Sequence, residues 1–175
     1  MAFTLGKSPE DPRLIGPLHA CLAEQALNAG DLATAADEVT EGLAVLKDAA
    51  LAEEEIRLLA AGARVCADLA SLPRSARQSD LAAGWEPLAA TFAERSRAIV
   101  NRHTGRPEVA AFGTLVAAEH ARQRGGDDRA TWRAAAEAWQ LAGQPYREAY
   151  ARLREAEAAV RAGRREQAVL ALAAC

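Results

Sequence analysis

The residues best suited to binding chemistry are aromatic side chains in the last third of the chain. Trp132 and Trp139 are seven residues apart, so a helix presents both on one face. Tyr146 and Tyr150 follow closely, in a chain that has only eight aromatic residues. This spacing is compatible with two structures: an aromatic-lined groove for a peptide or effector, or a piece of core between adjacent helices.

Arginines lie next to these aromatic residues. A guanidinium group can bind a carboxylate through two parallel hydrogen bonds, so arginines facing a groove would recognise an acidic ligand. Ion pairing on the surface is the alternative role. The candidate groove or partner-binding residues are therefore Trp132, Trp139, Tyr146, Arg147, Tyr150, Arg152 and Arg154.

Histidines and cysteines do not form a catalytic or metal-binding pattern. No two of His19, His103 and His120 are three or four residues apart, as two metal ligands on one helix face would be. His120 is expected on an apolar face, with a local partner. Cys21 and Cys66 are expected to be buried as small hydrophobic residues, with a redox pair as the alternative.

The remaining polar residues suggest no reaction either. No serine lies in a context that would activate it as a nucleophile. The carboxylates are expected mostly on solvent-exposed helix faces, with Glu148 and Arg152 pairing across one turn. We predict no catalytic residue, no metal site and no cofactor. A small helical enzyme stays open as a third class, which a pocket with converging ionisable groups would favour.

Composition strongly favours helices. Alanine supplies 45 of the 175 residues, whereas valine and isoleucine together supply 11, which almost excludes a large sheet. The net charge of −3 argues against direct nucleic-acid binding. The chain has no apolar run long enough to cross a membrane and no signal-peptide pattern, so we expect a cytoplasmic protein.

Glycine, proline and hydrophobic periodicity divide the chain into about eight helices. Residues 1–12 form a predicted flexible leader, and residues 13–175 a single helical-repeat domain. Residues 74–84 are polar and less regular. The predicted helices cover about 14–29, 32–47, 51–71, 87–103, 107–124, 129–142, 145–162 and 164–174. Their short connections predict antiparallel helix pairs.

Two segments of the chain match each other without gaps. Residues 23–35 (AEQALNAGDLATA) and 156–168 (AEAAVRAGRREQA) share the structural positions Ala23/Ala156, Gly30/Gly163 and Ala35/Ala168. Each match describes two helices that approach closely through alanine and turn at glycine. The pattern resembles the turn of a tetratricopeptide repeat, which implies an all-α stack of helix pairs with a superhelical twist. A chance match in an alanine-rich sequence is the alternative.

A longer resemblance covers the last third of the chain. Residues 117–175 resemble the helical-repeat region of large ATP-binding transcriptional regulators of the LuxR family. The residues that carry this resemblance are Glu119, Arg122, Gly125, Trp132, Trp139, Gly143, Pro145, Tyr146, Ala149, Tyr150, Arg152, Arg154, Ala156, Glu157 and Gly163. In those regulators the region lies between an ATPase domain and a DNA-binding helix-turn-helix. This chain has neither a phosphate-binding loop motif nor a terminal helix-turn-helix.

The resemblance implies a non-catalytic module of a longer regulator. Such a module would bind an effector or partner, or relay a signal between the neighbouring domains. The alternative is a free-standing adaptor that binds a peptide or protein in its groove. The last predicted helix carries Val169, Leu170 and Leu172 with no later helix to cover them, which predicts weak association into a homodimer.

Overall fold

The protein is all-α throughout the part of the chain that the computed structural model describes, which is residues 11–71, 76–126 and 129–174. Its helices are α1 (Pro12–Ala29), α2 (Leu32–Val45), α3 (Ala52–Ser71), α4 (Ala76–Trp85), α5 (Leu88–Arg102), α6 (Pro107–Gln123), α7 (Arg129–Leu141), α8 (Pro145–Arg161) and α9 (Arg165–Ala173). The predicted all-α class and its eight helices are confirmed, and the short α4 is added in the polar region.

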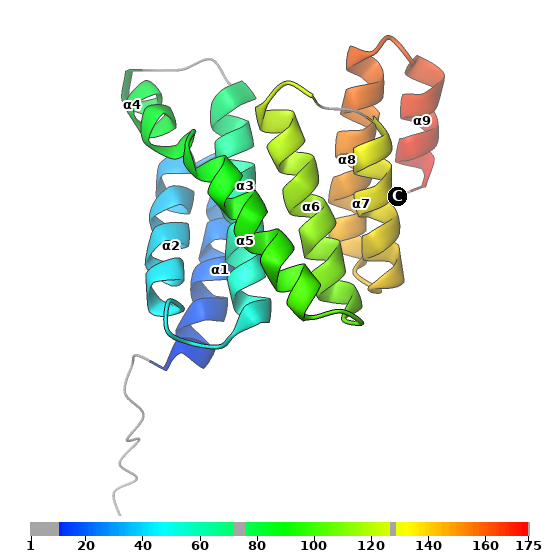
Figure 1. The fold of residues 1–175 in the computed structure, drawn as a ribbon. Helices are drawn as coiled ribbons and strands as arrows, with labels where there is room; N and C mark the ends of the chain where they lie inside the picture. Colours follow the sequence, from blue (N-terminus) through cyan, green and yellow to red (C-terminus); the bar gives the residue numbers. More distant parts are fainter. Residues whose placement is uncertain (1–10, 72–75, 127–128, 175) are drawn as a thin grey trace, which may run out of the picture.

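Consecutive helices pack as antiparallel pairs in a repeat-like stack (Figure 1). The consecutive pairs are α1/α2, α6/α7 and α8/α9. Between them lies a fourth pair, α3/α5, whose helices are separated in the chain by α4 and cross obliquely. Helix α3 also packs against α1 and α6, and α5 crosses diagonally over α3 and α6. One side of the stack is therefore built from the first helix of each pair.

The turns of the two matching segments have the geometry that the sequence predicts. Gly30 ends α1 at φ 76°, and Gly163 follows α8 at φ 73°, in the left-handed region that glycine adopts without strain. Asp31 then caps α2, because its carboxylate accepts a hydrogen bond from the backbone N–H of Thr34 at 3.1 Å. These local signals fix the direction in which each second helix starts.

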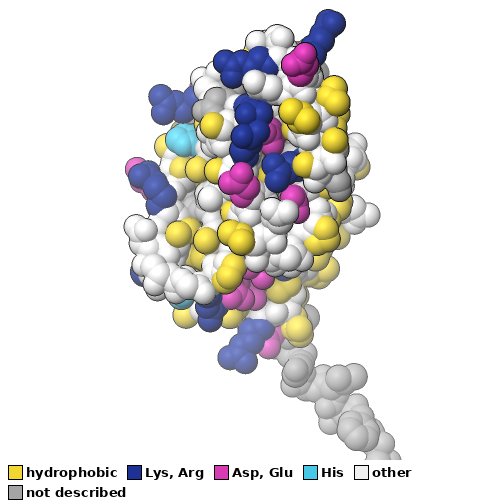
Figure 2. Space-filling model, turned by 90° about the vertical axis from the view of Figure 1, so that its right-hand side faces the viewer, with side chains coloured by type: hydrophobic (Ala, Val, Ile, Leu, Met, Phe, Trp, Pro, Cys, Tyr) yellow, Lys and Arg dark blue, Asp and Glu magenta, His cyan; other side chains and the backbone are white. Residues whose placement is uncertain are grey.

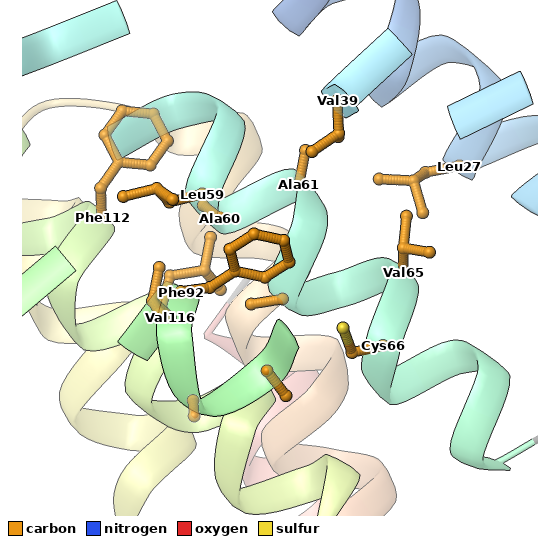
Figure 3. Close-up of a cluster of buried hydrophobic side chains, with 14 of the residues drawn as sticks. Leu27, Val39, Leu59, Ala60, Ala61, Val65, Cys66, Phe92, Phe112 and Val116 are labelled. Carbon is orange, nitrogen blue, oxygen red and sulfur yellow. The ribbon is translucent and has the colours of Figure 1, made fainter. Parts of the chain in front are cut away.

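The core consists of small residues interleaved with a few large ones. Leu59, Phe92, Phe112 and Val116 pack together from α3, α5 and α6 (Figure 3). Gly62 of α3 lies against the ring of Phe92, where a β-carbon would come within 2.8 Å of Cε2. The absence of a side chain at this position is what lets α5 approach α3 so closely.

Two expectations about the N-terminal part change. Residues 1–10 of the predicted leader lie outside the described part of the chain, but Asp11 and Pro12 cap and begin α1. Asp11 accepts a hydrogen bond from the backbone N–H of Arg13, and proline suits the first position of a helix. Cys21 is exposed rather than buried, because it lies on the outer face of α1, whereas Cys66 is buried as predicted.

The end of the stack formed by α8 and α9 exposes apolar side chains. Val169 is 65% exposed, Leu170 68% and Leu172 50%. On this side, small hydrophobic groups alternate with arginine and acidic side chains (Figure 2). Within the described residues, no helix is long and apolar enough to span a membrane.

Candidate functional site

Four helices surround a small cavity in the middle of the stack. α1, α3, α6 and α8, the first helices of the four pairs, all contribute to its wall. The cavity measures about 50 Å³ and is lined by Glu24, Leu27, Asn28, Arg57, Ala60, Ala61, Arg64, Leu115, Glu119, Tyr146, Arg147 and Tyr150. Its wall combines alanine and leucine with charged and phenolic groups, a mixture typical of a binding site.

Helix α3 supplies two arginines to this wall. Arg57 and Arg64 are seven residues apart and therefore lie on the same face of the helix. Ala60 and Ala61 lie between them, and both are buried. Because alanine is short, it leaves space between the two long side chains, and this space contributes to the cavity.

The rim of the cavity joins the first and the last pair of the stack. Arg147 of α8 forms an ion pair with Glu24 of α1, with Nη1 and Oε1 2.7 Å apart. Asn28 of α1 donates a hydrogen bond to the hydroxyl of Tyr146 at 2.9 Å and accepts one from Arg64 at 3.3 Å. The two contacts between α1 and α8 join residues more than a hundred positions apart.

Arg147 is held in place by aromatic rings as well. Its guanidinium carbon lies 4.7 Å from the ring centroid of Phe112 and 5.3 Å from that of Trp139. The two rings meet edge to face at 4.7 Å. Cation–π contacts of this kind stabilise a charge that is partly withdrawn from water, so Arg147 has a fixed position at the rim.

A buried network of charged and hydrogen-bonded side chains adjoins the cavity. Glu119 is fully buried, and its two oxygens have different partners. One accepts a hydrogen bond from the Tyr150 hydroxyl at 2.5 Å, and the other accepts from Arg122 Nε at 2.8 Å. The carboxylate therefore links α6 to α8, and its charge is compensated inside the protein.

Arg122 extends this network to α3. Its Nη2 donates to Asp68 at 2.6 Å, and Arg154 approaches the same carboxylate oxygen at 3.5 Å. Burial lowers the pKa of Arg122, but the carboxylates of Glu119 and Asp68 outweigh it and raise the pKa, so the group stays charged. Burial and the nearby Glu119 raise the pKa of Tyr150 well above its ordinary value, so its hydroxyl keeps its proton.

Two arginines at the cavity have donors without acceptors. The Nε atoms of Arg57 and Arg64 are buried, and neither has a hydrogen-bond partner within the described residues. Arg64 Nε lies 3.7 Å from Asp68, which is too long for a hydrogen bond. Buried donors in native structures are nearly always satisfied by protein, water or a ligand. These two groups are therefore available to an acceptor such as water.

The structure separates the predicted site residues into two sets. Tyr146, Arg147 and Tyr150 line the cavity. Trp132 and Trp139 do not line a groove, since both are fully buried in the core. The two indoles instead fill the space between α7 and its neighbours. The structure therefore has the alternative arrangement, an aromatic piece of core between adjacent helices.

The remaining predicted arginines lie outside the cavity wall. Arg154 donates to the Tyr150 hydroxyl at 3.1 Å and to Glu157 at 2.8 Å. Arg152 pairs with Glu148 at 3.5 Å, as predicted, and with Glu155 at 3.1 Å. Surface ion pairing is therefore not their full role, because Glu155 is buried.

Several site residues were missed by the sequence interpretation. Glu24, Asn28, Arg57, Arg64 and Glu119 were not candidates, and carboxylates were expected on solvent-exposed faces. That expectation is wrong for Glu119 and Glu155, since both are buried.

No family model matches the chain, and no curated protein or solved structure is significantly similar to it.

Proposed function

We propose that this chain is a non-catalytic helical-repeat module that binds an effector or a partner where α1, α3, α6 and α8 converge. The observation that carries the proposal is the cavity wall, which brings together polar side chains from all four helix pairs. A ligand there contacts the first and last pairs at once and thereby biases the curvature of the whole stack.

A regulator of the LuxR type is the setting that the proposal favours. The support is the resemblance of residues 117–175, together with the helix-pair architecture that this resemblance implies. Gly125, Gly143 and Gly163 belong to the resemblance, and each has positive φ two residues after the end of α6, α7 or α8. In such a regulator, ligand-dependent curvature would be transmitted to neighbouring domains.

The absence of catalysis is also part of the proposal. Tyr150, Arg122 and Arg154, whose pKa values are all raised, are tied to one another and to carboxylates. Tyr150 holds its proton and Arg122 its charge, so neither is poised to exchange a proton near neutral pH. Their contacts join α3, α6 and α8, which is a structural role.

A free-standing adaptor is the second candidate, and the exposed apolar face of α9 favours it. Val169, Leu170 and Leu172 present side chains that a protein partner could bury. An adaptor would contact its partner there, outside the cavity, whereas an effector-binding module would respond through the cavity.

One experiment separates these candidates. Small molecules and macromolecules extracted from the source cells are tested separately for a shift in the melting temperature of the wild type, Arg57→Gln and Arg165→Gln. Arg165 is an exposed arginine on α9 and serves as the matched control. The proposal expects the small-molecule fraction to stabilise the wild type and the control but not Arg57→Gln.

The same experiment can contradict the proposal. Stabilisation by the macromolecular fraction alone, unaffected by Arg57→Gln, favours the adaptor. The reading frame of the gene provides an independent test of the LuxR setting: a phosphate-binding loop encoded upstream and a helix-turn-helix downstream support it, and an isolated frame contradicts it.

A further inference from the structure

The geometry points to a small organic anion, an oxyanion on a short apolar body, as the ligand of the four-helix cavity. This inference rests on the proposed function and specifies the ligand class for the same site. It also assigns Glu24 a role: its carboxylate occupies Arg147 until the ligand anion competes for that arginine.

The unmet donors define the anionic part of the ligand. Arg57 forms no hydrogen bond or ion pair within the described residues, and its buried Nε lacks an acceptor. Arg64 gives one long hydrogen bond to Asn28 and leaves its own Nε unsatisfied. A carboxylate or phosphate supplies several acceptor lone pairs and carries the opposite charge.

The charge balance around the cavity also favours an anion. Among the described residues, Asp68 is the one carboxylate that forms an ion pair with Arg64, and it is shared with two other arginines, Arg122 and Arg154. Glu119 is occupied by Arg122 and Tyr150, and Glu24 is occupied by Arg147. No ion pair between Arg57 and a carboxylate is found in the described part of the chain.

The rest of the wall defines the apolar part and its size. Leu27, Ala60, Ala61 and Leu115 contribute aliphatic surface beside the two arginines. A water needs roughly 10–15 Å³ of such space, so a cavity of about 50 Å³ admits a group of only a few heavy atoms. A short-chain carboxylate fits this volume, whereas an extended peptide does not unless the rim opens.

The rim controls access to the cavity. The pair formed by Glu24 and Arg147 and the hydrogen bond between Asn28 and Tyr146 close it on the side between α1 and α8. Glu24 is 30% exposed, so its carboxylate can turn into solvent when another anion replaces it. Removal of its charge should therefore strengthen ligand binding, which a merely structural ion pair would not do.

The test measures binding of defined probes to the full chain by isothermal titration calorimetry at constant ionic strength. The probes are butyrate, its uncharged analogue butyramide, and inorganic phosphate. We expect saturable binding of butyrate with a Kd of about 1 mM or tighter, and no saturable binding of butyramide. Phosphate distinguishes a site for any anion from one that also requires an apolar group on the ligand. Stronger binding of phosphate than of butyrate would overturn the claim that the ligand carries an apolar body.

Substitutions assign the binding to the cavity. Arg57→Gln should weaken butyrate binding by roughly tenfold or more, because a charge-assisted hydrogen bond is lost, and Arg165→Gln should leave it unchanged. Glu24→Gln should tighten it. Arg64→Gln replaces Arg57→Gln if the latter does not give the far-ultraviolet circular dichroism of the folded chain.

Three results overturn the inference: no saturable binding of butyrate, equal binding of butyramide, or equal effects of Arg57→Gln and Arg165→Gln. Water alone then satisfies the two arginines. If the small-molecule extract still stabilises the chain in an Arg57-dependent way, the proposed function stands and only the ligand class is wrong. If the extract has no effect either, both are wrong.

Discussion

The buried carboxylate of Glu119 should be the most sensitive polar position for stability. Glu119→Ala removes the acceptor of the Tyr150 hydroxyl and one of the two carboxylates that compensate Arg122. Arg122 is only 6% exposed, so water cannot replace the lost partner. Breaking a buried ion pair on one side typically costs about 3–5 kcal/mol.

The remaining ion-pair partner of Arg122 sets the expected size of this effect. Asp68 remains 2.6 Å from Arg122, which keeps the arginine partly compensated and places the loss at the lower end, about 3 kcal/mol. For a chain of this length, that loss lowers the melting temperature by roughly 6–12 °C. Glu119→Gln keeps the shape and one acceptor, so it should cost about 1–3 kcal/mol.

The assay is urea denaturation followed by far-ultraviolet circular dichroism, with Glu157→Ala as the matched control. Glu157 also pairs with an arginine, Arg154, but its side chain is 37% exposed, so its removal should cost about 0–1 kcal/mol. A double-mutant cycle with Tyr150→Phe then isolates the hydrogen bond between Glu119 and Tyr150. Equal losses for Glu119→Ala and Glu157→Ala would refute the argument.

Three further predictions concern packing, pH and association. Ala156→Leu or Ala168→Leu should cost about 1–3 kcal/mol, because both alanines are buried in one small cluster between α8 and α9; unchanged melting temperatures in both variants would count against the repeat assignment. Burial, with the cations of Arg124 and Arg97, lowers the pKa of His120 below its ordinary 6.5. The free energy of unfolding should therefore decrease as the pH falls from 6.5 through the lowered pKa of His120, and His120→Asn should reduce this pH dependence. The same pH dependence in both proteins between pH 7 and 5 would contradict the prediction. Leu170→Glu with Leu172→Glu should leave the fold intact, because both leucines are at least half exposed, and should dissociate any dimer; a wild type that sediments as a monomer at high concentration shows that this face does not self-associate.

The helices were predictable because their ends carry strong local signals. Gly30, Gly143 and Gly163 have positive φ, and Pro107 and Pro145 begin helices, so the chain itself marks where each helix starts or stops. The largest gap in the prediction was α4, whose sequence has neither a regular apolar stripe nor a clear cap. The pairing of consecutive helices then follows from the short connections.

The candidate site was only partly predictable, because a sequence shows which face a residue occupies but not what lies opposite. In α6 the apolar stripe of Val109, Phe112 and Val116 continues to Glu119, whereas His120 was expected there. The three-residue step from Val116 to Glu119 is as good a helical match as the four-residue step to His120. The distinction depends on Tyr150 and Asp68, which come from other helices.

The two tryptophans show the same limit from the other side. Their spacing correctly places both on one face of α7, but it does not say whether that face meets solvent or another helix. The edge-to-face contact between Trp139 and Phe112 settles the point, since Phe112 belongs to α6. A buried aromatic ring can still shape the site, because Trp139 lies 5.3 Å from the guanidinium of Arg147.

The buried network and the cavity are mechanically connected through one side chain. The Tyr150 hydroxyl donates a hydrogen bond to Glu119, and the centroid of the Tyr150 ring lies 4.5 Å from the guanidinium carbon of Arg64 in the cavity wall. A buried ion pair is often no more stabilising than a well-packed apolar group, so stability alone does not account for Glu119. Glu119 therefore fixes Tyr150, whose ring packs against Arg64 in the cavity wall. In the proposed ligand-binding function, such an arrangement would lower the cost of binding, because the donors would already be in place when the ligand arrives.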